Sequence, residues 1–417
     1  MARTPTAATR ATRTPPTADR ALVTQPSALS RCAAVDAATF ATEHWSRTPL
    51  LSRAKELPQP FDDLLSTQDV DELVTDRALR TPFFRTVRDG GGLPLPTRTV
   101  TAGSRRIGDL VDPAALAAQY ADGATLVLQS VHRMHPPVAR FCRSLAAELG
   151  HPTQCNAYLT PGGQHQGFDF HHDTHDVFVL QVSGRKRWIV HEPVLRLPLP
   201  DQPQSGAHLV PDGAEPLVDV ELEAGDALYL PRGYVHAALT TDVDSVHLTV
   251  GVLATTWYDV LRDAVTLAAG AEQFRSALPV APRSSLADSL PDFLRQAAAW
   301  LESLPTSSVA EVVDRRLARS VPAEPLSLLA SAAAVRSLGP ASALRPRAGL
   351  EVGVRVDSGS IVLALPGKSV ALPAFTEPAV RHLLAGPTTP AELPGLDEES
   401  ALVLARRLLR EGLLLPG

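Results

Sequence analysis

The 417-residue chain has few cysteines and no long apolar run, and each shortage excludes a class of protein. Its three cysteines, Cys32, Cys142 and Cys155, form no CxxC pair and no even set. This argues against a disulfide-built secreted domain and fits a reducing cytoplasm. No apolar run reaches the ~18 residues that a membrane span needs. The net charge of −6 gives no overall attraction to nucleic acid or anionic lipid. We therefore expect a cytoplasmic protein that binds no membrane.

The remaining composition is that of a folded protein with several domains. Hydrophobic residues make up 44% of the chain and charged residues 20%, which is close to the globular average. Residues 1–31 differ, since they hold five Arg, one acid and many Thr, Ala and Pro, without apolar periodicity. We predict a disordered tail there. The alternative is an organellar transit peptide, which is also rich in Arg and poor in acids but is amphipathic.

Residues 32–256 carry the strand signal of the chain. Short β-rich runs alternate with Gly and Pro: GATLVLQSV, DVFVLQVSG, RKRWIVHEP, DALYLPRG and DSVHLTVGVL. This pattern predicts an antiparallel barrel or jelly roll. One helical stretch, HPPVARFCRSLAAELG, interrupts it and should end at Gly150.

Two further modules are predicted after the β-rich region. Residues 257–340 are helical, with one helix ending at Gly270, and PDFLRQAAAWLESL has apolar residues at helical spacing. These apolar stripes need a partner surface, so we expect homodimerisation. Residues 345–417 combine alternating strands, turns and a helix between Asp397 and Gly412, which suits a winged-helix-like module. From Pro346 onward seven basic residues face eight acids, so we expect protein contacts and no direct nucleic-acid binding.

Histidine is concentrated in one stretch, since nine of the thirteen lie within residues 151–247. His171 and Asp173 form an HxD tripeptide, and residues i and i+2 of a strand point to the same face. Alone, this tripeptide is more often a polar surface loop. GDALYLPRGYVH is more specific, because its spacing G-x5-P-x-G-x2-H places His236 just past a predicted strand. Two His and one carboxylate leave three open positions on a metal, which is typical of non-heme Fe(II) sites. A structural zinc site would use four protein ligands.

Lysine is scarce, and the position of one lysine is therefore informative. Lys186 is one of three lysines beside 36 arginines, and it follows the predicted Ser183-Gly184 turn. It should share one face of a strand with Trp188 and Val190. An ammonium among apolar residues needs an anionic partner, and the far carboxylate of a metal-chelating dicarboxylate would be one. The alternative is a solvated hairpin tip, because arginines flank Lys186 on both sides.

Taken together, these motifs resemble the JmjC-type protein oxygenases of the cupin superfamily, in particular the ribosomal oxygenase branch. The similarity covers most of the chain and includes FATEHWSRTPLL, GATLVLQSVHRMHPPVARFCR, NAYLTPGGQHQGF, HHDTHDVFVLQVSGRKRW, GDALYLPRGYVH and SVHLTVGVL. It implies an α+β chain with a double-stranded β-helix, or jelly roll, followed by a helical dimerisation module and a winged-helix-like module. It also implies a hydroxylase that uses Fe(II), O2 and 2-oxoglutarate and releases succinate and CO2. The substrates that it implies are Arg or His side chains of ribosomal proteins.

The resemblance also implies roles for six residues. The iron ligands would be His171, Asp173 and His236, and 2-oxoglutarate would contact Lys186, Tyr158 and Asn156.

The sequence departs from the family pattern at two places. The loop PGGQHQGF is one residue longer than usual, which puts an extra imidazole, His165, at the expected pocket rim. Gly251 stands where a hydroxyl residue is expected beside the cosubstrate, and Thr249 is the nearest substitute. We expect a changed set of cosubstrate contacts and an unchanged metal triad.

Other histidines in the region have expected positions. His172 should point away from the metal as a wall residue, and His247 should line the barrel interior. His175 is expected in a loop, with a substrate contact as the alternative.

Three other functions stay open at this point. The same chemistry could act on a peptide or a small metabolite, because substrate choice depends on loops. The barrel could bind a metal without turnover, although a buried lysine is unnecessary in such a scaffold. A hydrolytic zinc site with water in its open positions is the third alternative.

Overall fold

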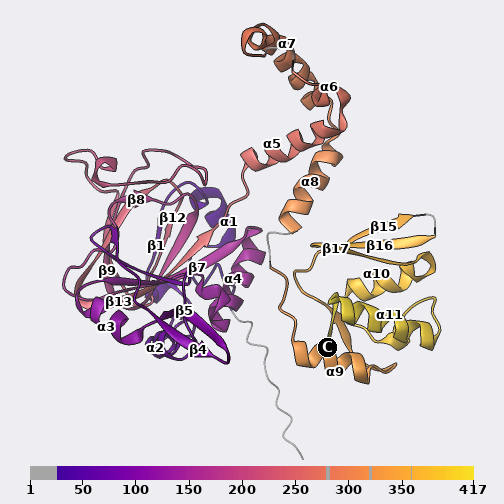
Figure 1. Cartoon of the computed structure of the whole chain (residues 1–417), viewed down its shortest axis with the longest axis horizontal. Coiled ribbons are helices and arrows are strands. Elements are labelled where there is room, and N and C mark those ends of the chain that lie inside the picture. Colours follow the sequence, from indigo (N-terminus) through magenta and orange to yellow (C-terminus); the bar gives the residue numbers. More distant parts are fainter. Residues whose placement is uncertain (1–25, 279–281, 319–321, 358) are drawn as a thin grey trace, which may run out of the picture.

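The structure, a computed structural model, describes residues 26–278, 282–318, 322–357 and 359–417. Figure 1 shows a β-rich unit, an arm of helices and a C-terminal α/β unit along the chain. None of the described helices combines the length and apolarity that crossing a membrane requires.

Part of the predicted N-terminal tail, residues 26–31, lies within the described structure and is folded. Residues 1–25 lie outside the described residues, whereas Ala28 and Leu29 are buried and their backbone N–H groups donate to Glu148. Arg31 forms an ion pair with Asp63 at 2.6 Å. The boundary at residue 31 is therefore wrong, because residues 26–31 pack onto the β-rich unit.

One eleven-stranded sheet forms the β-rich unit, and its recorded pairings are antiparallel. Its main path runs β1 (Leu50–Ser52), β12 (Ala227–Leu230), β9 (Asp176–His191), β13 (Val235–Val252), β7 (Thr153–Thr160), β6 (Thr125–Leu128), β2 (Phe84–Arg88) and β3 (Gly91–Gly92). Beside this path lie β8 (His171–His172), β10 (Gln204–Ser205) and β11 (Val218–Glu223). Each long strand changes partner along its length; β9, for example, pairs first with β12 and then with β11. The predicted antiparallel core is confirmed.

Successive side chains of β9 point to opposite faces of the sheet, and each face packs into its own apolar cluster. Phe178 and Leu180 are fully buried in a large core that helices cover from outside. Val177 and Val179 point to the other face, where they pack with Trp188. The helices of this unit are α1 (Ala37–Thr39), α2 (Thr67–Thr75), α3 (Pro113–Ala121) and α4 (Pro136–Leu149), and a separate hairpin joins β4 (Thr97–Ala102) to β5 (Arg105–Val111). As predicted, α4 ends at Gly150, whose φ is 70°.

The predicted hairpin turn at Ser183-Gly184 is wrong, because β9 runs through it as one strand. Gly184 has φ 65°, and a Cβ there would lie 1.7 Å from the carbonyl oxygen of Asp244. The pairing of β9 with β13 shifts register beside this glycine. Gly184 thus bends the strand where β13 passes closely, so Lys186 lies inside a strand and not at a hairpin tip.

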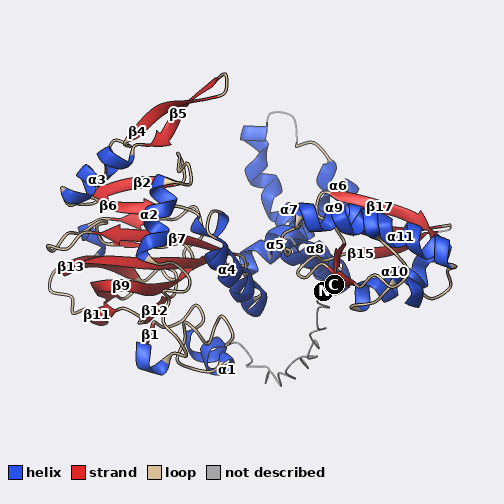
Figure 2. Ribbon diagram, turned by 90° about the horizontal axis from the view of Figure 1, so that it is seen from below, coloured by secondary structure: helices blue, strands red, loops and turns tan. Residues whose placement is uncertain are grey.

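The chain continues into the helical arm that is visible in Figures 1 and 2. Its helices are α5 (Trp257–Thr266), α6 (Glu272–Arg275), α7 (Pro282–Ser303) and α8 (Thr306–Ala318). Asp263 of α5 pairs with Arg316 of α8, which holds these two helices together. Large apolar side chains of the arm stay exposed, including Trp257 at 86% and Leu294 at 60%.

The C-terminal unit has its own core and begins earlier than predicted. It contains α9 (Leu328–Ser337), β14 (Leu344–Pro346), β15 (Gly353–Asp357), β16 (Ser360–Leu365), β17 (Lys368–Pro373), α10 (Glu377–Ala385), α11 (Glu398–Glu411) and β18 (Leu414–Pro416). Strands β15, β16 and β17 form a small antiparallel sheet, and α11 runs from the Asp397 cap to Gly412 as predicted. Val335 and Leu338 pack into this core, so α9 belongs to it and the boundary at residue 340 is too late.

Candidate functional site

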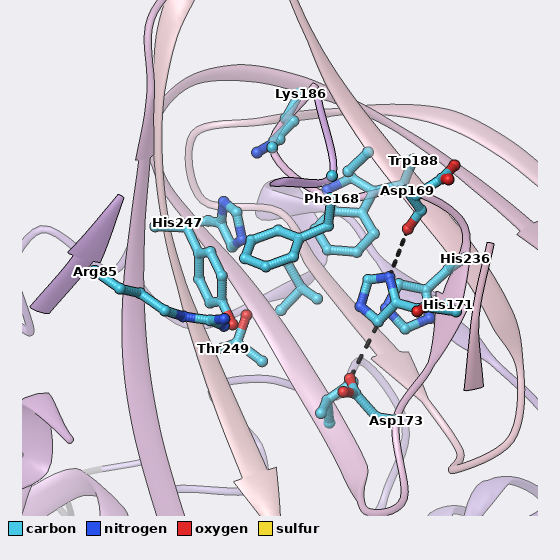
Figure 3. Close-up of a pocket in the computed structure, with 17 residues that line it drawn as sticks. Arg85, Phe168, Asp169, His171, Asp173, Lys186, Trp188, His236, His247 and Thr249 are labelled. Carbon is cyan, nitrogen blue, oxygen red and sulfur yellow. Dashed lines mark hydrogen bonds and ion pairs between the residues drawn. The ribbon is translucent and has the colours of Figure 1, made fainter. Parts of the chain in front are cut away.

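A cavity of about 310 Å³ opens into the face of the sheet that the helices leave uncovered. Strands β7, β8, β9 and β13 contribute to its wall, and Figure 3 shows the side chains that point into it. The cavity contains the three predicted metal ligands and Lys186. Motifs that lie up to 65 positions apart in the sequence therefore share one site, since His171 and His236 pair across β8 and β13.

The three predicted ligands face one another closely enough to hold one ion. Single donor atoms of His171, Asp173 and His236 all lie within 4.8 Å of one another. His236 Nε2 is 3.8 Å from Asp173 Oδ2, and the two imidazole centroids are 4.4 Å apart. In the part of the chain that the structure describes, this is the cluster of His, Cys, Asp or Glu side chains with metal-binding geometry.

Backbone carbonyl groups set the orientation of both imidazoles. The Nδ1 atom of His171 lies 2.9 Å from the carbonyl oxygen of Asp169, and that of His236 lies 3.0 Å from that of Tyr234. When Nδ1–H donates to a carbonyl, Nε2 keeps its lone pair and becomes the ligand atom. Both rings are thus presented in the tautomer that a metal needs.

The protonation states of His236 and Asp173 also favour binding of a metal cation. Burial lowers the pKa of His236 to about 4, so this ring is neutral at pH 7. Desolvation raises the pKa of Asp173, but the nearby imidazoles of His236 and His175 outweigh it and hold the pKa below its ordinary value. A neutral imidazole and an ionised carboxylate are the forms that bind metal ions.

Lys186 is buried at the far end of the same cavity. Lys186 is 4% exposed, and its Nζ donates a hydrogen bond to Thr160 Oγ1 at 2.9 Å. No ion pair of Lys186 occurs among the described residues. Desolvation lowers its pKa to about 7. An ammonium in this position lacks the carboxylate that buried lysines usually require, and a bound anion would supply it.

Two more polar atoms on this wall lack partners among the described residues. They are Trp188 Nε1 and His247 Nδ1, both buried. The His247 ring stacks on the Tyr158 ring, with centroids 4.9 Å apart. The Trp188 ring packs edge-on against the same His247 ring, with centroids 5.5 Å apart. The Trp188 ring also lies 5.8 Å from the His236 ring, centroid to centroid, so it lies between the predicted metal ligands and Lys186. Burial and the charge of Lys186 hold the pKa of His247 well below its ordinary value.

The predicted cosubstrate residues divide into two groups. Tyr158 lines the cavity, as does Thr249, the predicted substitute for a missing hydroxyl. Asn156 is not among the lining residues, and its Oδ1 accepts a hydrogen bond from the backbone N–H of Ser130. Gly251 has a different role from the expected one: a Cβ there would lie 2.3 Å from the His175 ring, so the glycine makes room for that imidazole.

The remaining histidines lie outside the cavity wall, apart from His247, which lines it as expected. His165 does not form the expected extra imidazole of the pocket, because its ring packs against Gly123. His172 is buried and points away from the ligands, with Nε2 3.0 Å from the carbonyl oxygen of Gln202. His175 lies beside Gln154, with the two Nε2 atoms 3.4 Å apart.

Sequence reasoning missed several side chains of the site, among them Thr160 and Arg85. Thr160, the hydrogen-bond partner of Lys186, lies two residues after Tyr158 on β7, so strand alternation could have identified it. Arg85 comes from β2, with its guanidinium 4.8 Å from the centre of the Phe168 ring. No local motif marks Arg85, because its place in the cavity depends on the pairing of β2 with β6.

Comparison with known proteins gives the site a context. Residues 128–260 match the model of the JmjC domain. The chain is 36% identical over 217 residues to ribosomal oxygenase 1 of Gallus gallus, covering 51% of this chain and 34% of that protein. It is 31% identical over 223 residues to the bifunctional lysine-specific demethylase and histidyl-hydroxylase NO66 of Drosophila mojavensis, covering 52% and 24%. The chain thus spans about a quarter to a third of the length of these relatives.

The fold is similar to that of a solved bacterial protein. The Escherichia coli ribosomal oxygenase YcfD aligns with a TM-score of 0.52 and 19% identity, covering 92% of this chain and 98% of that one. A further structure of YcfD, in complex with cobalt and succinic acid, aligns with the same TM-score of 0.52. The similarity extends beyond the β-rich unit, since nearly the whole of both chains is covered.

Proposed function

Because the chain contains a JmjC domain, we propose that it is an Fe(II)- and 2-oxoglutarate-dependent oxygenase that hydroxylates a protein side chain. Succinate and CO2 would be the co-products. The observation that carries this proposal is one cavity with two ends. A His-Asp-His cluster with metal-binding geometry lies at one end, and a buried lysine that has no carboxylate partner among the described residues lies at the other.

The residues present fit both groups that this chemistry requires. Two imidazoles and one carboxylate are the donor set of mononuclear Fe(II) oxygenases and leave three positions open. The ammonium of Lys186, the indole N–H of Trp188 and Nδ1 of His247 line the same cavity, and none of them has an anionic partner among the described residues. Buried polar groups without partners cost free energy, and a ligand with acceptor oxygens would satisfy them.

Each residue has a distinct task in this proposal. His171, Asp173 and His236 would hold Fe(II), which when bound supplies open coordination positions for 2-oxoglutarate and O2. Lys186, held by Thr160, would bind the far carboxylate of 2-oxoglutarate, with Tyr158 beside it. The apolar wall excludes bulk water from this end of the cavity and so strengthens the charge pair.

We propose a ribosomal protein as the substrate, with an Arg or His side chain as the target. Support comes from relatives that are named ribosomal oxygenase and histidyl-hydroxylase, and from the structural neighbour that binds cobalt and succinic acid. The alternative is the same chemistry on a peptide or a small metabolite. Mass spectrometry of ribosomal proteins from a deletion strain separates the two: loss of one oxygen atom from a specific side chain supports the ribosomal substrate.

A succinate assay separates the oxygenase from the other functions. Purified protein is loaded anaerobically with Fe(II), exposed to air with 2-oxoglutarate, and assayed for succinate with and without metal. We expect metal-dependent succinate. Metal binding without succinate, with ribosomal proteins added, would favour a metal-binding cupin, and hydrolysis that depends on Zn²⁺ would favour a hydrolase.

We further propose that the helical arm mediates homodimerisation. The support is its exposed apolar surface, which includes Trp257, Leu261, Phe293 and Leu294. The C-terminal unit would be a winged-helix-like module for protein contact without direct binding of nucleic acid. A cytoplasmic location remains part of the proposal, supported by three cysteines that are all free and buried.

A further inference from the structure

A buried ion pair connects the two chain segments that carry the metal ligands. Asp176 lies three residues after Asp173, and Arg232 lies four residues before His236. Arg232 Nη1 is 3.0 Å from Asp176 Oδ2, and the two side chains are 10% and 0% exposed. Neither residue lines the cavity, so neither touches what binds there.

Asp176 also receives several other hydrogen bonds. The Tyr229 hydroxyl donates to its Oδ1 at 2.9 Å, and the Ser46 hydroxyl lies 3.2 Å from the same atom. Arg232 Nη1 donates to Ser46 Oγ at 3.2 Å as well. The pair is therefore also fixed by Tyr229 of β12 and by Ser46 of the N-terminal segment.

A direct backbone contact also joins the two chain segments. The N–H of Gly233 donates to the carbonyl oxygen of Asp173 at 3.0 Å. Gly233 has φ 93°, and a Cβ there would lie 2.4 Å from the carbonyl oxygen of Leu195. The turn before His236 thus has little freedom to move without the Asp173 loop.

Stability alone does not account for an ion pair that is largely removed from water. The cost of removing both charges from water offsets much of their attraction, and well-packed neutral residues of similar volume are often as stable. What an ion pair adds is a defined distance and direction between two groups. Here the ion pair joins the segment that follows Asp173 to the turn that precedes His236.

We infer that Asp176 and Arg232 are positioning residues that hold Asp173 and His236 at metal-binding distance. The inference rests on the proposed function, because it assumes that the triad binds a metal ion. It predicts that neutralising the pair weakens and distorts metal binding even in a protein that still folds.

The test uses the full chain with Co(II) as the metal probe. In the double variant Asp176→Asn with Arg232→Met, Asn still accepts from Tyr229 and Met fills the space of the arginine stem. The matched control is Asp226→Asn with Arg53→Met, a pair with Nη1–Oδ2 at 2.7 Å and a 5% exposed carboxylate at the opposite end of β12. Thermal unfolding, Co(II) affinity and the visible Co(II) spectrum are measured for each protein.

We expect the Asp176 double variant to bind Co(II) at least about tenfold more weakly, with a shifted visible band, while the control double variant matches the wild type. Arg232→Lys, which keeps the charge, should fall between the two. If the double variant does not fold, Arg232→Lys decides, and an unchanged affinity and spectrum in it overturn the inference. A folded double variant with wild-type affinity and spectrum overturns it as well. Absence of Co(II) binding by the wild type would instead overturn the proposed function, and with it this inference.

Discussion

Replacing Lys186 with Met should have opposite effects on the ligand-free protein and on cosubstrate binding. The ammonium is buried, donates to Thr160 and has no ion pair among the described residues. In the ligand-free protein it is therefore a desolvated charge, and its removal should raise the free energy of unfolding. In the proposed complex with 2-oxoglutarate it would be the partner of a carboxylate, so its removal should weaken binding.

The size of the binding loss follows from the kind of contact. A hydrogen bond between charged groups contributes about 1.5–3 kcal/mol. Since about 1.4 kcal/mol is tenfold in affinity, Lys186→Met should raise the 2-oxoglutarate requirement by roughly tenfold to a hundredfold. The carboxylate would also be left unpaired in a buried site, which increases the loss. Lys186→Arg should be intermediate, because the charge remains while length and geometry change.

The dependence on pH has a defined sign. Burial lowers the pKa of Lys186 to about 7 in the folded protein, whereas an unfolded chain has a lysine pKa of about 10.4. Between these values the unfolded state binds more protons, so ligand-free stability should rise with pH by up to about 1.4 kcal/mol per unit. An anion favours the protonated ammonium, so 2-oxoglutarate affinity should fall as pH rises above about 7. Lys186→Met should abolish both trends.

Two measurements test this reasoning. Thermal unfolding without ligand gives the stability, and succinate formation at increasing 2-oxoglutarate concentration gives the cosubstrate requirement. The matched control is Lys368→Met, which removes a surface lysine that pairs with Glu411 in the C-terminal unit. Iron content should not change in either variant. Wild-type dependence on 2-oxoglutarate in Lys186→Met would refute the assignment and make a metal-binding scaffold as well supported as the oxygenase.

Three other outcomes are expected. His236→Ala should lose most bound metal and all succinate production, as measured by metal analysis and the succinate assay; full turnover would contradict the triad. Trp188→Phe removes an orphaned donor, so 2-oxoglutarate should bind up to roughly tenfold more weakly with unchanged iron content, whereas unchanged binding would mean that the indole N–H meets no ligand. The wild type should have a dimeric mass in light scattering at micromolar concentration, and Leu261→Glu combined with Leu294→Glu should shift it toward a monomer; a monomeric wild type would refute the dimer.

The sequence predicted the site better than the path of the chain around it. The HxD tripeptide and the P-x-G-x2-H spacing mark local geometry, so His171, Asp173 and His236 could be named without knowing how strands pair. Lys186 could be named because lysine is scarce in this chain and because it follows the HxD tripeptide at a recognisable position. Arg85 could not, since its place in the cavity depends on strand pairing over long sequence separations.

The errors have a common physical origin in contacts between distant segments. Ser183-Gly184 looks like a turn, but the carbonyl oxygen of Asp244 fills the space beside Gly184 and β9 continues through it. Residues 26–31 look disordered, but Glu148 of α4 accepts the backbone N–H groups of Ala28 and Leu29. Composition and periodicity report only local preference, and both outcomes are decided by a tertiary partner.

A contact between distant segments also explains Gly251, a position at which the sequence departs from the family pattern. From the sequence it is a missing hydroxyl at the cosubstrate, which would predict weaker binding. In the structure the space beside it holds the His175 ring, while Thr249, two positions earlier on the same face of β13, reaches the cavity. A side chain at position 251 would displace His175, which lies two residues from Asp173. The glycine is therefore coupled to the metal-ligand loop, and restoring the family hydroxyl there should disturb that loop before it improves any cosubstrate contact.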